Sequence, residues 1–186
     1  YFIPDKGGLT VNRLDAVTGA SSVVGDFAGR LPWPDAASAW TGSEGSPSAD
    51  GESWAFMVED DSGASLGLFV WDLPTDTITA TYDFAAAGVT DTPDYVSMSP
   101  TGEFVVVGYT GTAGVVAYTR SFDAEVRLVA QTEHSDLALL SGRRDASVHL
   151  DFEATGGPVQ YIDIEQAITT GTPSPVTLLD TYLGEG

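Results

Sequence analysis

Two stretches of the chain repeat the same order of polar and apolar positions. Residues 48–58 read SADGESWAFMV, and residues 99–109 read SPTGEFVVVGY. Each begins with serine, turns at a glycine and continues into aromatic and aliphatic residues that are typical of a buried strand. A weaker copy, LALLSGRRDASVHL, occupies residues 137–150. Each copy therefore predicts a β-hairpin.

A second pattern lies between these hairpins: a short apolar strand, an Asp or its substitute, a polar turn and another β-rich strand. It begins at LTVNRLDAVTG, LFVWDLPTDT, VVAYTRSFDA and PVQYIDIEQA, with the Asp or its substitute at positions 15, 72, 119 and 163. The intervals are 44 to 57 residues, with two hairpins in each. Four-stranded propeller blades produce this spacing.

Helical periodicity is weak, because residues 35–40 (DAASAW) and 163–168 (DIEQAI) can each form only one helical turn. With 21 Gly, 10 Pro and many β-branched residues, the chain is expected to be all-β. The second pattern occurs four times and the first three times, which indicates a β-propeller of about 3.5–4 four-stranded antiparallel blades. The predicted blades are residues 1–27 (in part), 44–84, 94–130 and 136–182.

A propeller closes with at least about four blades, so this count predicts that the chain is incomplete. We expect the 186 residues to be a single propeller domain or a fragment of one. The remaining blades would complete a larger ring of about seven. The chain opens with YFIPDKGG, which reads as the middle of a strand and not as the basic start of a signal peptide.

The inner hairpins resemble a known repeat. SPSADGESWAFMVED (residues 46–60) and YVSMSPTGEFVVVGY (residues 95–109) are similar to the SPDG repeat of TolB-like and WD40-like bacterial propellers. In that repeat the turn joins the two inner strands of a blade, and the resemblance implies a scaffold. A looser similarity connects TEHSDLAL (residues 132–139) with secreted propellers of the oligogalacturonate-lyase type. That resemblance implies elimination of uronic acid units by a histidine and a divalent cation.

The charge balance excludes some partners. The chain has 27 acidic and 7 basic residues and a formal charge of −20, so it lacks the basic patch that nucleic acid or an anionic membrane surface requires. No apolar run is long enough for membrane insertion. The acidity fits a solvated surface suited to a marine or halophilic habitat, or carboxylates that bind cations such as Ca²⁺. Without cysteine there are no disulfides or thiol nucleophiles, and we expect an extracellular or periplasmic location.

Loops between blades and loops between the two middle strands of a blade share one face of a propeller. His134 is expected there between two acidic neighbours, as a general base or metal ligand, although a structural histidine bridging strands fits the same pattern. Tyr109, at the end of the repeat, is a second catalytic candidate. The candidate ligand-binding residues of this face are Trp33, Trp40, Asp94, Glu133 and Asp136.

Two further groups have alternative interpretations. Glu59, Asp60 and Asp61 before a glycine resemble a small Ca²⁺ loop, but they also fit a solvated hairpin tip. Trp33 and Trp40 lie in the longest predicted inter-blade loop, either as an exposed platform for a sugar ring or buried beneath that loop. By contrast, two tryptophans within strand patterns, Trp54 and Trp71, are expected to pack between blades.

Two functions of different classes fit the sequence. The first is a non-catalytic propeller that binds a protein or carbohydrate ligand, as the generic repeats and the few His, Lys and Arg residues suggest. The alternative is a lyase-like enzyme that acts on uronic acid polysaccharides with His134 and a divalent cation. Whether the protein is an enzyme stays open at this point. A metal held by His134 and nearby acids would favour the enzyme.

Overall fold

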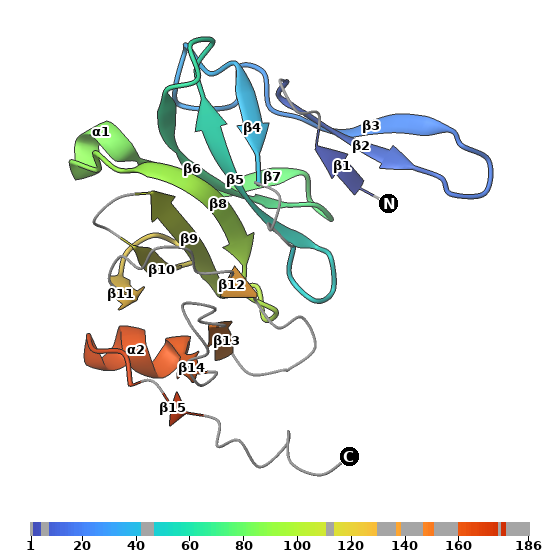
Figure 1. Ribbon diagram of the computed structural model, residues 1–186. Coiled ribbons are helices and arrows are strands. Elements are labelled where there is room, and N and C mark those ends of the chain that lie inside the picture. The colour runs from blue at the N-terminus through green and yellow to red at the C-terminus, as the bar shows by residue number, and fades with distance from the viewer. Residues whose placement is uncertain are drawn as a thin grey trace.

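The computed structural model describes residues 2–4, 8–41, 47–110, 114–129, 137–138, 147–150, 160–174 and 176–177. In this part of the chain, four antiparallel sheets follow one another, with only two short helices (Figure 1). Each sheet is a meander in which strands pair in chain order. The predicted all-β propeller class is confirmed by this arrangement.

The first sheet contains β1 (Phe2–Pro4), β2 (Thr10–Leu14) and β3 (Ser21–Asp26). The second sheet contains β4 (Ser38–Trp40), β5 (Ser53–Glu59), β6 (Ser65–Asp72) and β7 (Thr77–Asp83). The third sheet contains β8 (Thr92–Met98), β9 (Phe104–Thr110), β10 (Val115–Thr119) and β11 (Glu125–Val129). The fourth sheet contains β12 (Leu137–Ala138), β13 (Ser147–Leu150), β14 (Gln160–Asp163) and β15 (Val176–Thr177). Helix α1 (Phe84–Ala87) follows β7, and α2 (Ile164–Thr170) follows β14.

The repeated serine-to-glycine segment joins the first two strands of the second and third sheets. Its serine hydroxyl closes the turn by accepting a backbone N–H group five residues ahead. Ser48 Oγ accepts from Ser53 at 2.9 Å, and Ser99 Oγ accepts from Phe104 at 3.0 Å. The two copies of the motif therefore encode one turn, built with the same hydrogen bond.

The glycine of each copy is needed for its backbone conformation. Gly51 and Gly102 both have φ of +75°, in the left-handed region that glycine adopts without the steric cost of a Cβ. The two turns also contact each other, because the Ala49 N–H group donates to the Pro100 carbonyl oxygen at 2.9 Å. The motif thus both turns the chain and connects neighbouring sheets.

The recurring Asp or Thr of the second pattern is also explained by a turn. A side-chain oxygen accepts backbone N–H groups two to five residues further on, at 2.8 to 3.2 Å, at all four positions: Asp15, Asp72, Thr119 and Asp163. Asp72 and Thr119 close the turns between the third and fourth strands of their sheets, and Asp15 closes the turn between β2 and β3 of the first sheet. The fourth, Asp163, instead caps the N-terminus of α2.

Neighbouring sheets pack face to face through three apolar clusters. Val11 and Phe27 meet the second sheet, where Trp54 and Trp71 are buried, as the sequence predicted. Met57 of β5 belongs to the cluster between the second and third sheets. Ile162 of β14 belongs to the cluster between the third and fourth sheets.

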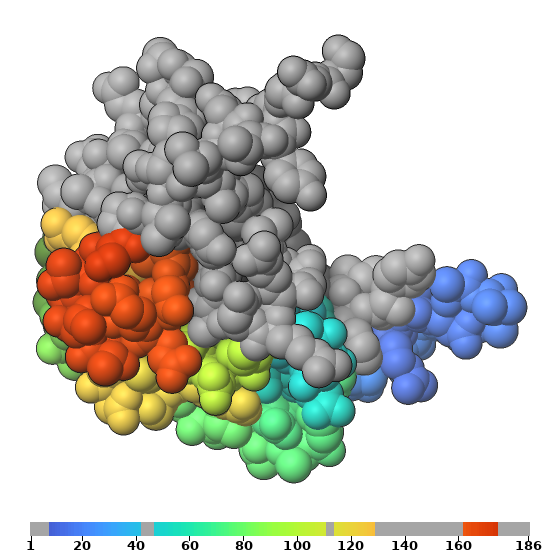
Figure 2. Space-filling view, turned by 90° about the horizontal axis from the view of Figure 1, so that it is seen from below, coloured from blue at the N-terminus to red at the C-terminus, as the bar shows by residue number. Residues whose placement is uncertain are grey.

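Alternation along β9 connects two of these clusters. Val105 and Val107 pack against the second sheet, and Val106 packs on the opposite face with residues of the fourth. The third sheet is therefore buried on both faces. Helix α2 lies against β10 and β11, on the side seen in Figure 2.

The structure corrects one local prediction and adds one helix. Residues 35–40 form no helical turn, because Ser38–Trp40 is β4 and pairs with β5. No helical periodicity in the sequence predicts α1. The helix is capped at both ends: the Asp83 side chain accepts the Ala86 N–H group at the N-terminus, and Gly88, with φ of 72°, ends the helix. Neither helix in the described residues is long and apolar enough to cross a membrane.

Candidate ligand-binding site

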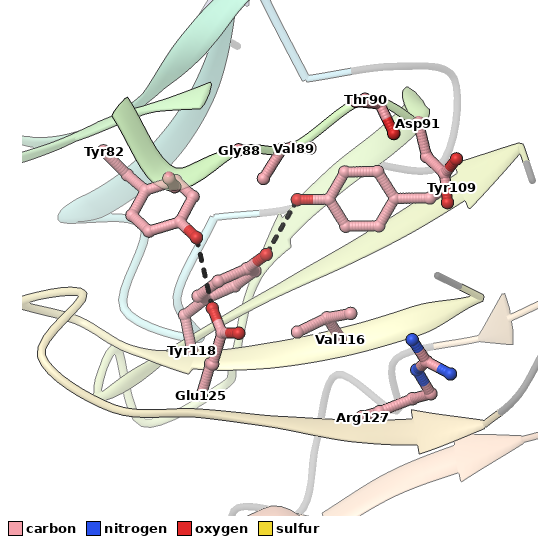
Figure 3. A pocket seen from close by; sticks show the side chains of 11 residues that line it. Tyr82, Gly88, Val89, Thr90, Asp91, Tyr109, Val116, Tyr118, Glu125 and Arg127 are labelled. Carbon is pink, nitrogen blue, oxygen red and sulfur yellow. Dashed lines mark hydrogen bonds between the residues drawn. The ribbon is translucent and has the colours of Figure 1, made fainter. Parts of the chain in front are cut away.

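A cavity of about 290 Å³ opens between the second and third sheets, on the face that carries the α1–β8 connection (Figure 3). Strands β7, β9, β10 and β11 supply its side chains together with that connection. We call it the tyrosine pocket and define it by six of its lining residues: Tyr82, Asp91, Tyr109, Tyr118, Glu125 and Arg127.

Strand alternation and a helix end place these groups. Tyr109 and Tyr118 continue the faces of β9 and β10 that pack against the second sheet, so both rings are buried. Phe84 anchors α1 beneath them, with its ring edge-on to Tyr109 at a centroid distance of 6.3 Å. The left-handed turn at Gly88 then directs the chain back, which brings Asp91 to the pocket.

Three tyrosine hydroxyls meet in the pocket. The hydroxyls of Tyr109 and Tyr118 are hydrogen-bonded at 2.8 Å, and either can be the donor. The Tyr82 hydroxyl donates to Glu125 Oε2 at 3.2 Å, and its ring lies 5.1 Å from that of Tyr118 (Figure 3). The floor is thus a set of phenols that ends at a carboxylate on the surface.

The environment keeps all three phenols protonated at neutral pH. Burial raises the pKa of both Tyr109 and Tyr118 above the ordinary value of about 10. Burial also raises the pKa of Tyr82, and the negative charge of Glu125 adds to that shift. A general base near neutral pH requires the opposite shift. Because the Tyr109 hydroxyl stays protonated, it is suited to hydrogen bonding with a ligand and not to proton abstraction.

Charged groups of both signs stand at the rim. Asp91 is half-buried, and Glu125 and Arg127 are exposed. Both carboxylates act on Tyr109, since each raises the pKa of its hydroxyl through its charge. Among the described residues, Arg30 and Arg120 form ion pairs, and the exposed Arg127 guanidinium stands at the rim.

The tryptophan platform is not formed. Trp33 is only 9% exposed, and its Nε1 donates to Asp83 Oδ2 at 3.0 Å. Trp40 lies in β4 and not in a loop, half-buried against the cluster between the second and third sheets. Trp33 therefore matches the alternative in which the indole is buried. Its ring is bonded to a strand of the second sheet and presents no open face to a sugar.

Of the predicted site residues, Tyr109 alone lines the tyrosine pocket within the described part of the chain. Asp94 is exposed in β8, at a register shift between its two neighbours, and does not line the pocket. The candidates Glu133, His134 and Asp136 lie outside the described residues.

The acidic hairpin does not have the arrangement of a calcium loop. Asp60 Oδ1 accepts the backbone N–H groups of Ser62 and Ala64 at 2.8 and 2.9 Å, and the Ser62 hydroxyl at 2.7 Å. In the described residues, which include Glu59, Asp60 and Asp61, no three acidic or histidine side chains are grouped to hold a metal. This carboxylate closes its own turn, as in a solvated hairpin tip.

Sequence comparisons find neither a matching protein family nor a matching curated protein. Among solved structures, hydrazine synthase of Kuenenia stuttgartiensis shares 16% identity over 95% of this chain, with a TM-score of 0.49. Regucalcin, a calcium-binding protein of Agrobacterium tumefaciens, shares 13% over 95%, with a TM-score of 0.42. A eukaryotic initiation factor shares 15% over 92%, with a TM-score of 0.41.

The aligned region covers 45%, 54% and 40% of those three chains, respectively. This chain therefore spans about half of their length or less. Because identity is so low, the fold class assigned to this protein is based on its own sheet topology.

Proposed function

We propose that this chain is part of a non-catalytic, secreted or periplasmic β-propeller that binds a small polar ligand in the tyrosine pocket. The observation that carries the proposal is the open cavity of about 290 Å³, in which phenol hydroxyls and charged side chains converge. Ligand sites are typically concave, with a few placed polar groups, and occupy roughly 300–1,000 Å³. The tyrosine pocket is at the small end of that range. Further blades outside these residues would complete the ring.

The chemistry of the pocket supports a binding role and argues against general-base catalysis by its phenols. Its phenols remain protonated, and they are held by one another and by Glu125. Such groups bind and orient a ligand but do not abstract a proton at neutral pH.

A substitution that fills the mouth of the cavity tests the proposal. Thr90 lines the pocket and is exposed, so Thr90→Trp places an indole over the opening. The matched control is Thr81→Trp, because Thr81 is exposed on β7 and does not line the pocket. Binding from a library of sugars, amino acids and nucleosides is measured by saturation-transfer NMR.

We expect Thr90→Trp to weaken the binding that the unaltered protein shows by about tenfold or more, a loss of roughly 1.4 kcal/mol. Thr81→Trp should leave that binding unchanged. Equal binding by both variants would place the ligand elsewhere and contradict the proposal. Turnover of an acidic polysaccharide that is lost in His134→Ala would contradict its non-catalytic part.

A further inference from the structure

We infer that the tyrosine pocket takes a neutral, hydroxyl-rich ring, namely a single sugar unit. This inference rests on the proposed function and specifies its ligand. It is carried by the hydrogen-bonding capacity of Tyr109, by the mixed charges at the rim and by the size of the cavity.

The Tyr109 hydroxyl can act toward a ligand either as donor or as acceptor. If Tyr118 donates to Tyr109, the Tyr109 proton is left for the cavity. If Tyr109 donates instead, its own oxygen offers lone pairs to the cavity. A ligand hydroxyl matches both arrangements, whereas a carboxylate or an ammonium group matches only one.

The rim residues can form hydrogen bonds with several ligand groups at once. Asp91 and Glu125 offer acceptor oxygens, and the Arg127 guanidinium offers donors in a fixed fork. Neighbouring hydroxyls of a sugar can donate to a carboxylate and accept from a guanidinium. The apolar side chains of Val89 and Val116 also line the cavity and suit the C–H face of a ring.

Net charge argues against anionic ligands. An anionic sugar would approach a chain of formal charge −20 and meet two carboxylates at the rim. A cation would be attracted by the two carboxylates, but it carries no acceptor for the Arg127 guanidinium or for the Tyr109 proton. A neutral polyol ring has both donors and acceptors and can bond to all of these groups at once. The cavity of about 290 Å³ has space for roughly ten waters at about 30 Å³ each, which is enough for one sugar ring.

The test is a ligand panel applied to the 186-residue protein. Its probes are methyl glycosides of neutral hexoses and pentoses, galacturonate, glucosamine and choline. Affinity is measured by calorimetry, and contact by saturation-transfer NMR. Tyr109→Phe removes one hydroxyl and keeps the ring. The matched control is Tyr95→Phe, since Tyr95 is a buried tyrosine of the other face of the third sheet.

We expect at least one neutral glycoside to bind more tightly than the three charged probes. Tyr109→Phe should weaken that binding by roughly twofold to tenfold, as for one hydrogen bond, and Tyr95→Phe should not. Arg127→Ala, at an exposed rim position, should also weaken it and leaves the core unchanged. Near-ultraviolet circular dichroism verifies that each variant keeps its packing.

The outcomes separate the two proposals. If galacturonate, glucosamine or choline binds best and Tyr109→Phe weakens it, the pocket is a binding site and the neutral-sugar assignment is overturned. If no probe in the panel binds, the neutral-sugar assignment is overturned, and the wider library with Thr90→Trp decides the proposed function. Neutral glycosides that bind to Tyr109→Phe and to Arg127→Ala as tightly as to the unaltered protein also overturn the assignment.

Discussion

Replacing Gly67 with alanine should expel Trp33 from its place between sheets. A Cβ built at Gly67 in β6 falls closer than 3.0 Å to both the Trp33 ring and the Tyr82 carbonyl oxygen. Ordinary contacts begin at 3.4 Å, so both contacts must be relieved. Relief of the carbonyl contact requires β6 and β7 to move apart locally. Relief of the ring contact requires the indole to shift, and its hydrogen bond to Asp83 is lost with it.

The expected loss in the free energy of unfolding combines the overpacking and the lost hydrogen bond. Overpacking a well-packed site costs about 1–3 kcal/mol, and the lost hydrogen bond adds about 1 kcal/mol. We expect the free energy of unfolding to fall by about 2–4 kcal/mol. For a chain of this length, the melting temperature should fall by roughly 5–15 °C.

Urea unfolding followed by far-ultraviolet circular dichroism measures the loss, and a red shift of tryptophan emission reports exposure of Trp33. Gly63→Ala is the matched control. Gly63 is the glycine of the preceding turn, with φ of +83° and no atom within 4 Å of a built Cβ. Backbone strain alone should cost it about 1 kcal/mol. A Gly67→Ala variant no less stable than Gly63→Ala, with unshifted emission, would refute the reasoning.

Two further predictions concern ionisation and the acidic hairpin. Because the raised pKa of Tyr118 applies only to the folded state, its stabilisation is complete below about pH 10 and is lost as pH rises further. Urea unfolding from pH 8 to 11 should show this decline, with a smaller slope in Tyr118→Phe; equal slopes would contradict it. In the hairpin, Asp60→Asn keeps the acceptor oxygen and should retain stability, whereas Asp60→Ala should lose about 0.5–1.5 kcal/mol. A melting temperature that Ca²⁺ raises in the unaltered protein but not in Asp60→Asn would instead indicate a metal loop.

The repeats could be read from the sequence because each depends on neighbours in the chain. Ser48 bonds five residues ahead, and Asp15 bonds two and three residues ahead. Such turns leave a local pattern of polar and glycine positions. Alternation likewise placed Trp54 and Trp71 between sheets. The all-β class, the hairpins and the short helix at Asp163 follow from these signals.

The signals in the sequence for the binding site are much weaker. Tyr109 was a candidate because it ends a repeat, but Tyr82 and Tyr118 look like ordinary strand aromatics in TYDF and VVAYT. The signal that was available is an aromatic residue with a polar tip, placed at alternating positions that face a neighbouring sheet. Of the two alternatives for Trp33 and Trp40, the exposed platform is not formed, for a related reason: β4 begins earlier than the pattern indicated, and Trp33 finds its hydrogen-bond acceptor, Asp83, 50 residues away.

The sequence by itself determined the order of strands, the chemistry of the turns and the strong acidity, because each is a property of adjacent residues or of composition. The tertiary structure alone decided which side chains share a pocket. Tyr82 comes from one sheet, and Tyr109 and Tyr118 come from the next. Their hydroxyls meet because two sheets pack face to face with a fixed offset, and no local pattern along the chain specifies that offset.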